Sequence, residues 1–173
     1  MLTELQETYC VDAARIFATG MSNGAIMSSQ SACDLSGSIA AVAPVSGLRL
    51  PEACHPSRPV AVLTFHGTAD PLLRYDGGGF WTYGAADAVQ RWAAQNGCDP
   101  SAHVSEPAPN TRLTTFTCPK GTAVELYTLV GAGHTWPGGP PLDVRTRNVL
   151  GAESNAIDAN AVIWRFFSDH PLR

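Results

Sequence analysis

Residues 15–24 have the sequence RIFATGMSNG, a short apolar stretch that leads into a glycine-bounded turn. The stretch at 15–19 predicts a buried strand, and the turn leads into a helix that extends to about Leu35. A G-x-S-x-G sequence between a strand and a helix is typical of a nucleophile elbow, which raises the serine hydroxyl above the sheet edge. Both glycines are expected where backbone segments approach too closely for a Cβ atom. Ser22 is therefore the candidate nucleophile.

Strand and helix patterns alternate along the rest of the chain, which predicts the α/β class with a parallel sheet covered by helices. Residues 60–65, VAVLTF, are continuously apolar, as expected of a strand buried on both faces. Four or five strands are expected in all, the others at residues 39–45, 111–117 and 123–130. A helix is expected at 85–96, with Val89, Trp92 and Ala93 on its buried side. The last helix is expected to begin near an Asn155 cap with Asp158 in its first turn, and to bury Ile157, Ala161, Trp164 and Phe167.

Composition excludes several classes of protein. The 173 residues, 45% hydrophobic and 15% charged, fit one packed domain at residues 1–173 and exclude a disordered chain. The net charge is −4, and Lys120 is the single lysine, so no basic cluster could follow a phosphate backbone, and nucleic acid is not an expected partner. No apolar run is long enough to cross a bilayer, and the N-terminus has no export signal, so no membrane contact is expected.

A serine nucleophile needs a base, and the base needs an orienting carboxylate. His134 follows the predicted strand at 123–130, and Asp70 follows the one at 60–65. Open α/β sheets bind their ligands at the carboxyl ends of such strands. The chain order Ser22, Asp70, His134 is the order found in α/β-hydrolases.

Two other residues could take these roles. His66 could act as the base, although a histidine at the end of a buried strand is more simply a structural one. Asp76 could replace Asp70, but a glycine-rich loop would hold it less rigidly. A metal site of His66, Asp70 and His134 lacks the paired-histidine spacing of such sites. We therefore expect no metal and no cofactor.

Three stretches together resemble the secreted polyhydroxybutyrate depolymerase and feruloyl esterase family of α/β-hydrolases, which is similar to carbohydrate esterase family 1. They are VDAARIFATGMSNG at 11–24, FHGTADP at 65–71 and GHTWPGG at 133–139. The resemblance covers nearly the whole chain. It implies an α/β-hydrolase-type fold, a mostly parallel sheet flanked by helices, and extracellular location.

The same resemblance implies a serine esterase. Ser22 would be the nucleophile, His134 the base and Asp70 the orienting acid, with the backbone N–H of Asn23 as an oxyanion donor. The implied substrates are short polyhydroxyalkanoate, feruloyl or acetyl-polysaccharide esters. Aromatic residues near the triad would form an apolar wall against the acyl or aryl group of the substrate. These residues are Trp136 and those of the loop from Tyr75 to Trp81.

Family members carry further strands before the position of Met1, with a His-Gly motif that supplies the second oxyanion donor. The resemblance implies that this chain lacks those N-terminal strands, so that the strand before Ser22 becomes an exposed edge. Such an edge could pair with another copy of the chain. The alternative to an active esterase is therefore an impaired hydrolase fragment that forms an oligomer or complements a missing N-terminal half.

Five cysteines without metal-type spacing suggest disulfides and one residue left over. The family resemblance implies a bond between Cys98 and Cys118, and a second bond is expected between Cys33 and Cys54. Cys10 would remain, its partner lying in the missing segment. The alternative is that all five are reduced and packed as small apolar residues.

Overall fold

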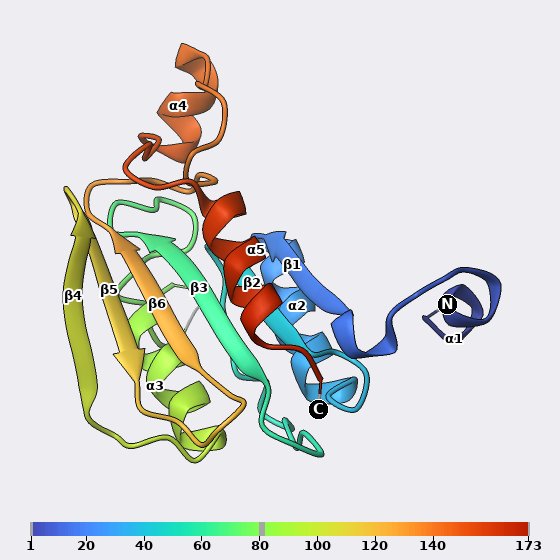
Figure 1. The fold of residues 1–173 in the computed structure, drawn as a ribbon. Helices are drawn as coiled ribbons and strands as arrows, with labels where there is room; N and C mark the ends of the chain where they lie inside the picture. Colours follow the sequence, from blue (N-terminus) through green and yellow to red (C-terminus); the bar gives the residue numbers. More distant parts are fainter. Residues whose placement is uncertain (1, 80–81, 173) are drawn as a thin grey trace.

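The computed structural model describes residues 2–79 and 82–172, and its centre is a six-stranded sheet (Figure 1). The strand order is β1-β2-β3-β6-β5-β4. The first four strands in this order are parallel, and β5 and β4 extend the sheet as antiparallel strands. The strands are β1 (Phe17–Met21), β2 (Ala41–Val45), β3 (Ala61–Gly67), β4 (Ala102–Ala108), β5 (Thr111–Phe116) and β6 (Val124–Leu129).

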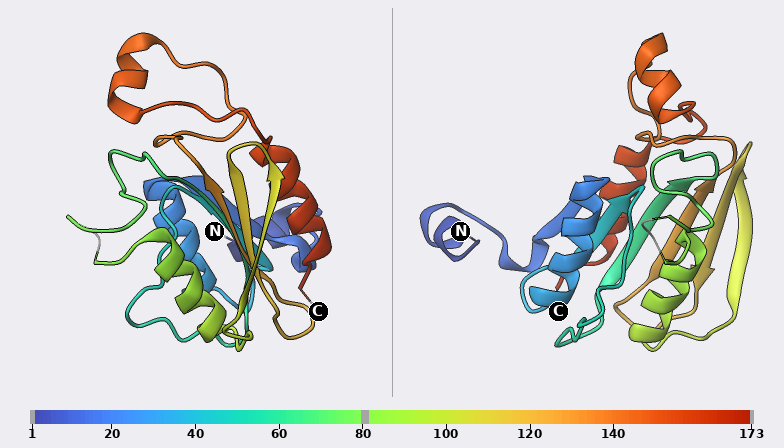
Figure 2. Two further views of the ribbon diagram at one scale, coloured as in Figure 1. Left: turned by 90° about the vertical axis from the view of Figure 1, so that its left-hand side faces the viewer. Right: turned by 180° about the vertical axis from the view of Figure 1, so that it is seen from behind.

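Helices cover both faces of the sheet. Figure 2 shows α2 and α3 on one face and α5 on the other, while α1 extends away from the sheet and α4 stands beyond the carboxyl ends of the parallel strands. A short 3₁₀ helix, Ala13–Arg15, precedes β1. The helices are α1 (Leu2–Thr8), α2 (Asn23–Asp34), α3 (Ala85–Gln95), α4 (Val144–Leu150) and α5 (Ala159–Asp169). The prediction of an α/β fold with a mostly parallel sheet is confirmed.

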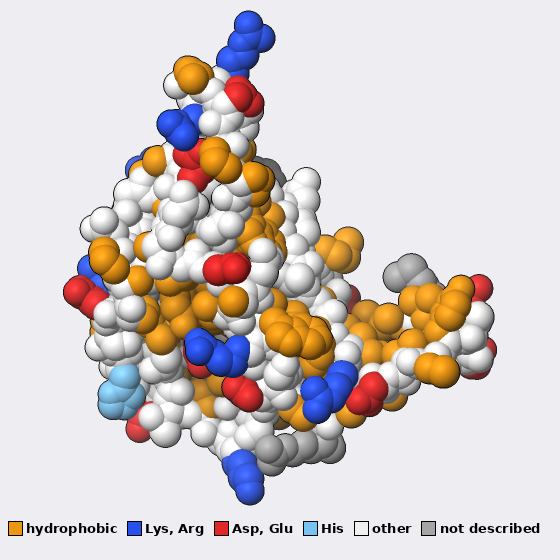
Figure 3. Space-filling view, turned by 45° about the horizontal axis from the view of Figure 1, so that its top comes forward, with side chains coloured by type: hydrophobic (Ala, Val, Ile, Leu, Met, Phe, Trp, Pro, Cys, Tyr) orange, Lys and Arg blue, Asp and Glu red, His pale blue; other side chains and the backbone are white. Residues whose placement is uncertain are grey.

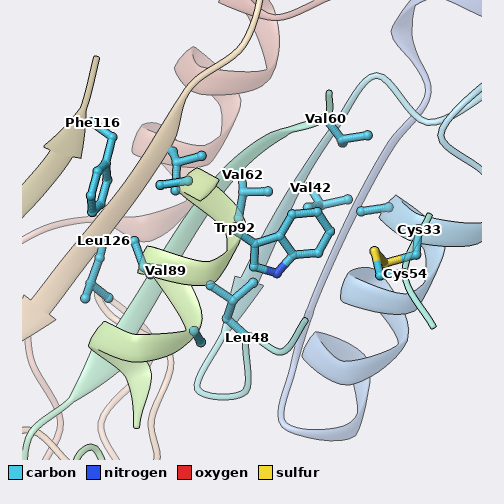
Figure 4. Close-up of a cluster of buried hydrophobic side chains, with 14 of the residues drawn as sticks. Cys33, Val42, Leu48, Cys54, Val60, Val62, Val89, Trp92, Phe116 and Leu126 are labelled. Atoms are coloured by element: carbon cyan, nitrogen blue, oxygen red, sulfur yellow. A yellow bond between two sulfur atoms is a disulfide. The ribbon is translucent and has the colours of Figure 1, made fainter. Parts of the chain in front are cut away.

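Each face of the sheet has its own core, because successive side chains of a strand point to opposite faces. Under α2 and α3, Trp92 is fully buried and packs among valines such as Val42 and Val62 (Figure 4). The indole Nε1–H of Trp92 donates to the carbonyl of Arg49 at 2.7 Å, so its polar group is satisfied. Under α5, the alternate strand residues Ala43, Leu63 and Phe65 form the second core.

Two disulfides brace the first of these cores. Cys33 is joined to Cys54 and Cys98 to Cys118, so both expected pairs are present. Cys33 and Cys54 are buried, and Figure 4 shows their bond beside α2. Cys10 is free and exposed.

The edge strand β4 was missed by the sequence pattern. Its sequence, AHVSEPA, contains one large apolar residue, Val104, and all of its residues but the last are exposed, so the apolar signal of the other strands is absent. The sheet therefore has six strands where four or five were expected.

The predicted start of the last helix was wrong, and its predicted buried face was wrong at Ala161 and Trp164 but correct at Phe167. The cap is Asp158, whose side chain accepts from the N–H groups of Asn160 and Ala161, and Asn155 lies outside the helix. Trp164 is 70% exposed, and Ala161 is exposed as well. The buried residues of α5 are Ala159, Ile163, Phe166 and Phe167.

None of the helices described within residues 2–79 and 82–172 is both long and apolar enough to cross a membrane.

Candidate active site

Ser22 sits in a sharp turn between β1 and α2. Its φ of 57° and ψ of −115° are a left-handed conformation that a non-glycine residue rarely adopts. The backbone N–H of Ser22 donates to the carbonyl of Val45 at the end of β2, at 3.0 Å, and so ties the turn to the neighbouring strand. Such strain persists only where the surrounding structure imposes it, and it clusters at functional sites.

The two glycines of the motif have different surroundings. A Cβ atom on Gly20 would lie 2.7 to 2.9 Å from three backbone atoms of Gly24, so the turn requires glycine at that position. A Cβ atom on Gly24 would meet no atom within 4 Å. The expectation that both glycines avoid a steric clash is therefore correct for Gly20 and wrong for Gly24.

The sequence analysis missed a third glycine at this turn. Gly47 follows β2, and a Cβ atom there would lie 3.0 Å from the carbonyl oxygen of Ser22. The SG pair directly after an apolar strand is the signal that could have identified it.

Asp70 and His134 are directly joined. The Nδ1 of His134 lies 2.7 Å from Oδ2 of Asp70, and both residues are almost completely buried. Asp70 follows β3 and His134 follows β6, and these strands are neighbours in the centre of the sheet. The other carboxylate oxygen of Asp70 accepts from the N–H groups of Leu72 and Leu73, at 2.9 and 2.8 Å.

These contacts keep Asp70 ionised. Burial by itself raises the pKa of the Asp70 carboxyl, but the hydrogen bonds from His134, Leu73 and Leu72 outweigh that effect and lower the pKa below its usual value. A buried carboxylate that accepts from Nδ1 of an imidazole fixes the ring orientation and leaves Nε2 as the nitrogen that can take a proton.

Ser22 lies at the same end of the sheet as Asp70 and His134. The strands β1, β3 and β6 run parallel, and each of the three residues comes after the carboxyl end of one of them. Met21, its neighbour in the chain, lines the same cavity as His134. No hydrogen bond joins Ser22 to His134, although both residues are described. Catalytic contacts of this kind are often long and tighten when substrate binds.

The backbone N–H of Asn23 is also at this edge. Asn23 is the first residue of α2, where N–H groups have no partner within the helix. Such a donor, directly after the nucleophile, is suited to bind a developing oxyanion.

A cavity of about 180 Å³ opens beside His134. Trp136, which the sequence analysis expects to contact the acyl or aryl group, is one of its lining residues. Tyr75 is not among its described lining residues: its ring meets the edge of His66, and its hydroxyl lies 2.8 Å from Thr128 Oγ1. Trp81 lies outside the described residues. The cavity is lined by Met21, His134, Thr135, Trp136, Gly139, Pro140, Leu142, Leu150 and Glu153.

The segment that contains α4 closes this cavity and was not predicted. The N–H of His134 donates to the carbonyl of Leu150 at 2.6 Å, which links the segment to the loop of the base. Arg147 donates two hydrogen bonds of 2.8 Å to Glu153, and Leu142 N–H donates a third at 2.6 Å. The bond from Arg147 and then that from Leu142 lower the pKa of Glu153 to about 2.

Two local signals could have identified α4. Asp143 caps its N-terminus by accepting from Arg145 and Thr146, and Gly151 ends it with a φ of 86°. An aspartate followed eight residues later by glycine fits a short capped helix.

Of the alternative site residues, His66 lies beside Asp70, with its Nε2 3.5 Å from Oδ2. The Nε2 of His66 lies 2.7 Å from the carbonyl oxygen of Leu73, which fits the structural role expected of it. Asp76 is exposed on the glycine-rich loop.

Comparison with known proteins finds relatives among the feruloyl esterases. Feruloyl esterase B of Piromyces equi is 34% identical over 146 residues, which are 77% of this chain and 27% of that protein. "Probable feruloyl esterase C" of Aspergillus niger is 30% identical over 171 residues, 96% of this chain and 54% of that protein. The chain thus spans about half or less of the length of these relatives. No family model matches the sequence.

A solved structure supports the fold. The acetyl xylan esterase from Aspergillus awamori superposes with a TM-score of 0.62 over 98% of this chain and 65% of its own, at 16% sequence identity. This likeness shows the α/β-hydrolase-type fold, and the sequence relatives show that the chain belongs to the feruloyl esterase family.

Proposed function

We propose that this chain carries the catalytic triad of a serine esterase. The observation that supports it best is the 2.7 Å bond between Asp70 and His134, at the sheet edge where Ser22 occupies a strained turn. Ser22 Oγ attacks the ester carbonyl, and His134 takes its proton and passes it to the leaving alcohol. The N–H of Asn23 stabilises the oxyanion, and water then hydrolyses the acyl-enzyme to release the acid.

We infer that the acyl group is a feruloyl or acetyl group carried on a polysaccharide. The names of the sequence relatives favour feruloyl esters, and the cavity beside His134 has a suitable size. Apolar protein cavities of about 150 Å³ bind benzene, so one of about 180 Å³ accommodates a single aromatic ring. Trp136 and Leu142 would contact this ring. Short polyhydroxyalkanoates are the competing substrate class.

The test compares hydrolysis of methyl ferulate, p-nitrophenyl acetate and a hydroxybutyrate oligomer by the wild-type chain and by Ser22→Ala. Ser31→Ala is the matched control, because Ser31 lies on the same helix and its hydroxyl donates only to the carbonyl of Met27. We expect Ser22→Ala to abolish turnover and Ser31→Ala to preserve it. A fluorophosphonate should add one adduct to the wild-type chain and none to Ser22→Ala. Equal rates for wild type and Ser22→Ala would refute the triad.

A second candidate function is favoured by the position of β1. It is the end strand of the sheet within the described residues, so one side of the strand that carries Ser22 has no neighbouring strand. Beside it, Phe17, Trp164 and Phe167 line an apolar hollow of about 390 Å³, on a face where hydrophobic side chains gather (Figure 3). An unpaired edge with apolar surface is suited to pair with another chain.

On this alternative, residues 1–173 form a single hydrolase-type domain that is impaired until the edge is covered. Sedimentation equilibrium separates the two candidates: a monomer of 18.3 kDa that turns over esters supports the esterase, and an inactive dimer supports edge pairing.

We also propose that the protein works outside the cell. Disulfides persist mainly in oxidising compartments, and this chain contains two. Export of the full-length protein into the culture medium of its host is the test, and retention in the cytosol would contradict the proposal.

A further inference from the structure

His66 has contacts that exceed those of an ordinary core histidine. It lies near the end of β3, is 5% exposed, and its Nε2 is 2.7 Å from the carbonyl oxygen of Leu73. A carbonyl oxygen can only accept, so Nε2 carries the proton in this hydrogen bond. The same nitrogen lies 3.5 Å from Oδ2 of Asp70, the oxygen that binds His134.

Leu73 connects His66 to the carboxylate. Its N–H donates to Oδ1 of Asp70 at 2.8 Å, while its carbonyl accepts from His66. The backbone of Leu73 is thus fixed from both sides. A shift of this residue would move a donor to Asp70, and so would turn the carboxylate relative to the imidazole of His134.

The proton state of His66 suits this position. Burial lowers its pKa, and His134 acts in the same direction, against the hydrogen bond to Leu73 and the charge of Asp70, which raise it. Tyr75, whose ring meets the edge of His66, is the other titratable group in direct contact. A neutral His66 donates a hydrogen bond without adding a positive charge, and therefore does not compete with His134 for the charge of Asp70.

We propose that His66 is a positioning residue, which fixes the turn after β3 so that Asp70 faces His134. The proposal rests on the proposed function, because it assigns Asp70 to the triad. A positioning role differs from a purely structural one in its consequence. Removing the N–H donor of His66 should loosen the contact between Asp70 and His134 while the fold persists.

The test uses two substitutions of similar size. His66→Leu removes the donor, whereas His66→Gln keeps an amide N–H that can reach the carbonyl of Leu73. A misplacement of about 1 Å can reduce a rate by about 100-fold. We therefore expect kcat of His66→Leu to fall between about 10-fold and 100-fold with KM little changed, and His66→Gln to recover most of the loss.

Two further readouts separate positioning from folding and from the triad assignment. The proton on Nδ1 of His134 should give a low-field ¹H resonance, which should weaken in His66→Leu and persist in His66→Gln. In an Asp70→Asn background, His66→Leu should cause no further loss of kcat, because His66 acts through Asp70.

An unchanged low-field resonance in a folded His66→Leu protein would overturn the proposal, whether or not the chain is active. Full additivity of His66→Leu and Asp70→Asn would also overturn it. If Asp70→Asn alone leaves kcat unchanged, the assignment of Asp70 to the triad is wrong. In that case the low-field resonance of His134 is the readout that decides whether His66 holds Asp70 against His134.

Discussion

The turn that carries Ser22 can be tested with its own two glycines. Replacing Gly20 by alanine places a Cβ atom 2.7 Å from the carbonyl carbon of Gly24, about 0.7 Å inside the 3.4 Å at which ordinary contact begins. The atoms it meets are backbone atoms of α2, which no side-chain rotation can move away. Overpacking of this kind costs about 1–3 kcal/mol.

The same displacement acts on the nucleophile. The start of α2 must move away from β1, and Ser22 lies between the two. Since a shift of about 1 Å can cost about 100-fold in rate, we expect Gly20→Ala to lower kcat by about that factor. Gly24→Ala is the matched control, because its Cβ atom meets nothing within 4 Å and alanine stabilises a helix by up to about 1 kcal/mol relative to glycine.

Urea unfolding gives the free energy of both variants, and hydrolysis of methyl ferulate gives their rates. The expected order of stability is Gly24→Ala, then wild type, then Gly20→Ala, with activity lost only in the last. If Gly24→Ala proves the more damaged of the two, the steric account of the turn is refuted.

Three further predictions concern stability. Replacing Cys98 and Cys118 by serine should lower the free energy of unfolding by about 3 kcal/mol, because their bond closes a loop with a sequence separation of 20; an unchanged urea midpoint would contradict this. Because burial lowers the pKa of His66, the unfolded chain binds more protons below about pH 6.5, so stability should fall as the pH decreases from about 7.5 to 5.5. His66→Gln should reduce the slope of stability against pH. Equal slopes in the wild type and in His66→Gln would contradict the role of His66 in this pH dependence. Trp92→Phe removes the hydrogen bond from the indole N–H to the carbonyl of Arg49 and shrinks a fully buried side chain, so it should cost about 1–3 kcal/mol in thermal or urea unfolding. A cost near zero would show that neither the bond nor the ring stabilises the fold.

The central strands and the candidate site could be predicted because their signals are local. The run at 60–65 is almost wholly apolar because β3 has a neighbouring strand on each side and a core on each face. Its one polar residue, Thr64, is accommodated because its hydroxyl donates to the carbonyl of Pro44. Ser22 follows its strand directly, and Asp70 and His134 lie in the loops that follow theirs, so the strand prediction placed all three at the carboxyl ends of parallel strands.

The elements that were missed depend on distant partners or on turn chemistry. β4 is an exposed strand without an apolar run, and it forms because it pairs with β5 across a turn at Pro109 and Asn110, where Asn110 has a φ of 54°. That Pro-Asn pair was the available signal. Trp164 was assigned to the core from helical spacing, but the true cap at Asp158 and the contact of α5 with the sheet set a different buried face.

The two halves of the candidate site have unequal support from the fold. Asp70 and His134 follow β3 and β6, which are central strands with a neighbour on each side. Ser22 follows β1, which has a neighbouring strand on one side only among residues 2–79 and 82–172, and its turn is held by the bond from its N–H to Val45. Any change that weakens the pairing of β1 with β2 should therefore move the nucleophile and leave the bond between Asp70 and His134 in place. A chain that pairs with the unpaired side of β1 would therefore change activity by moving Ser22, without contacting His134.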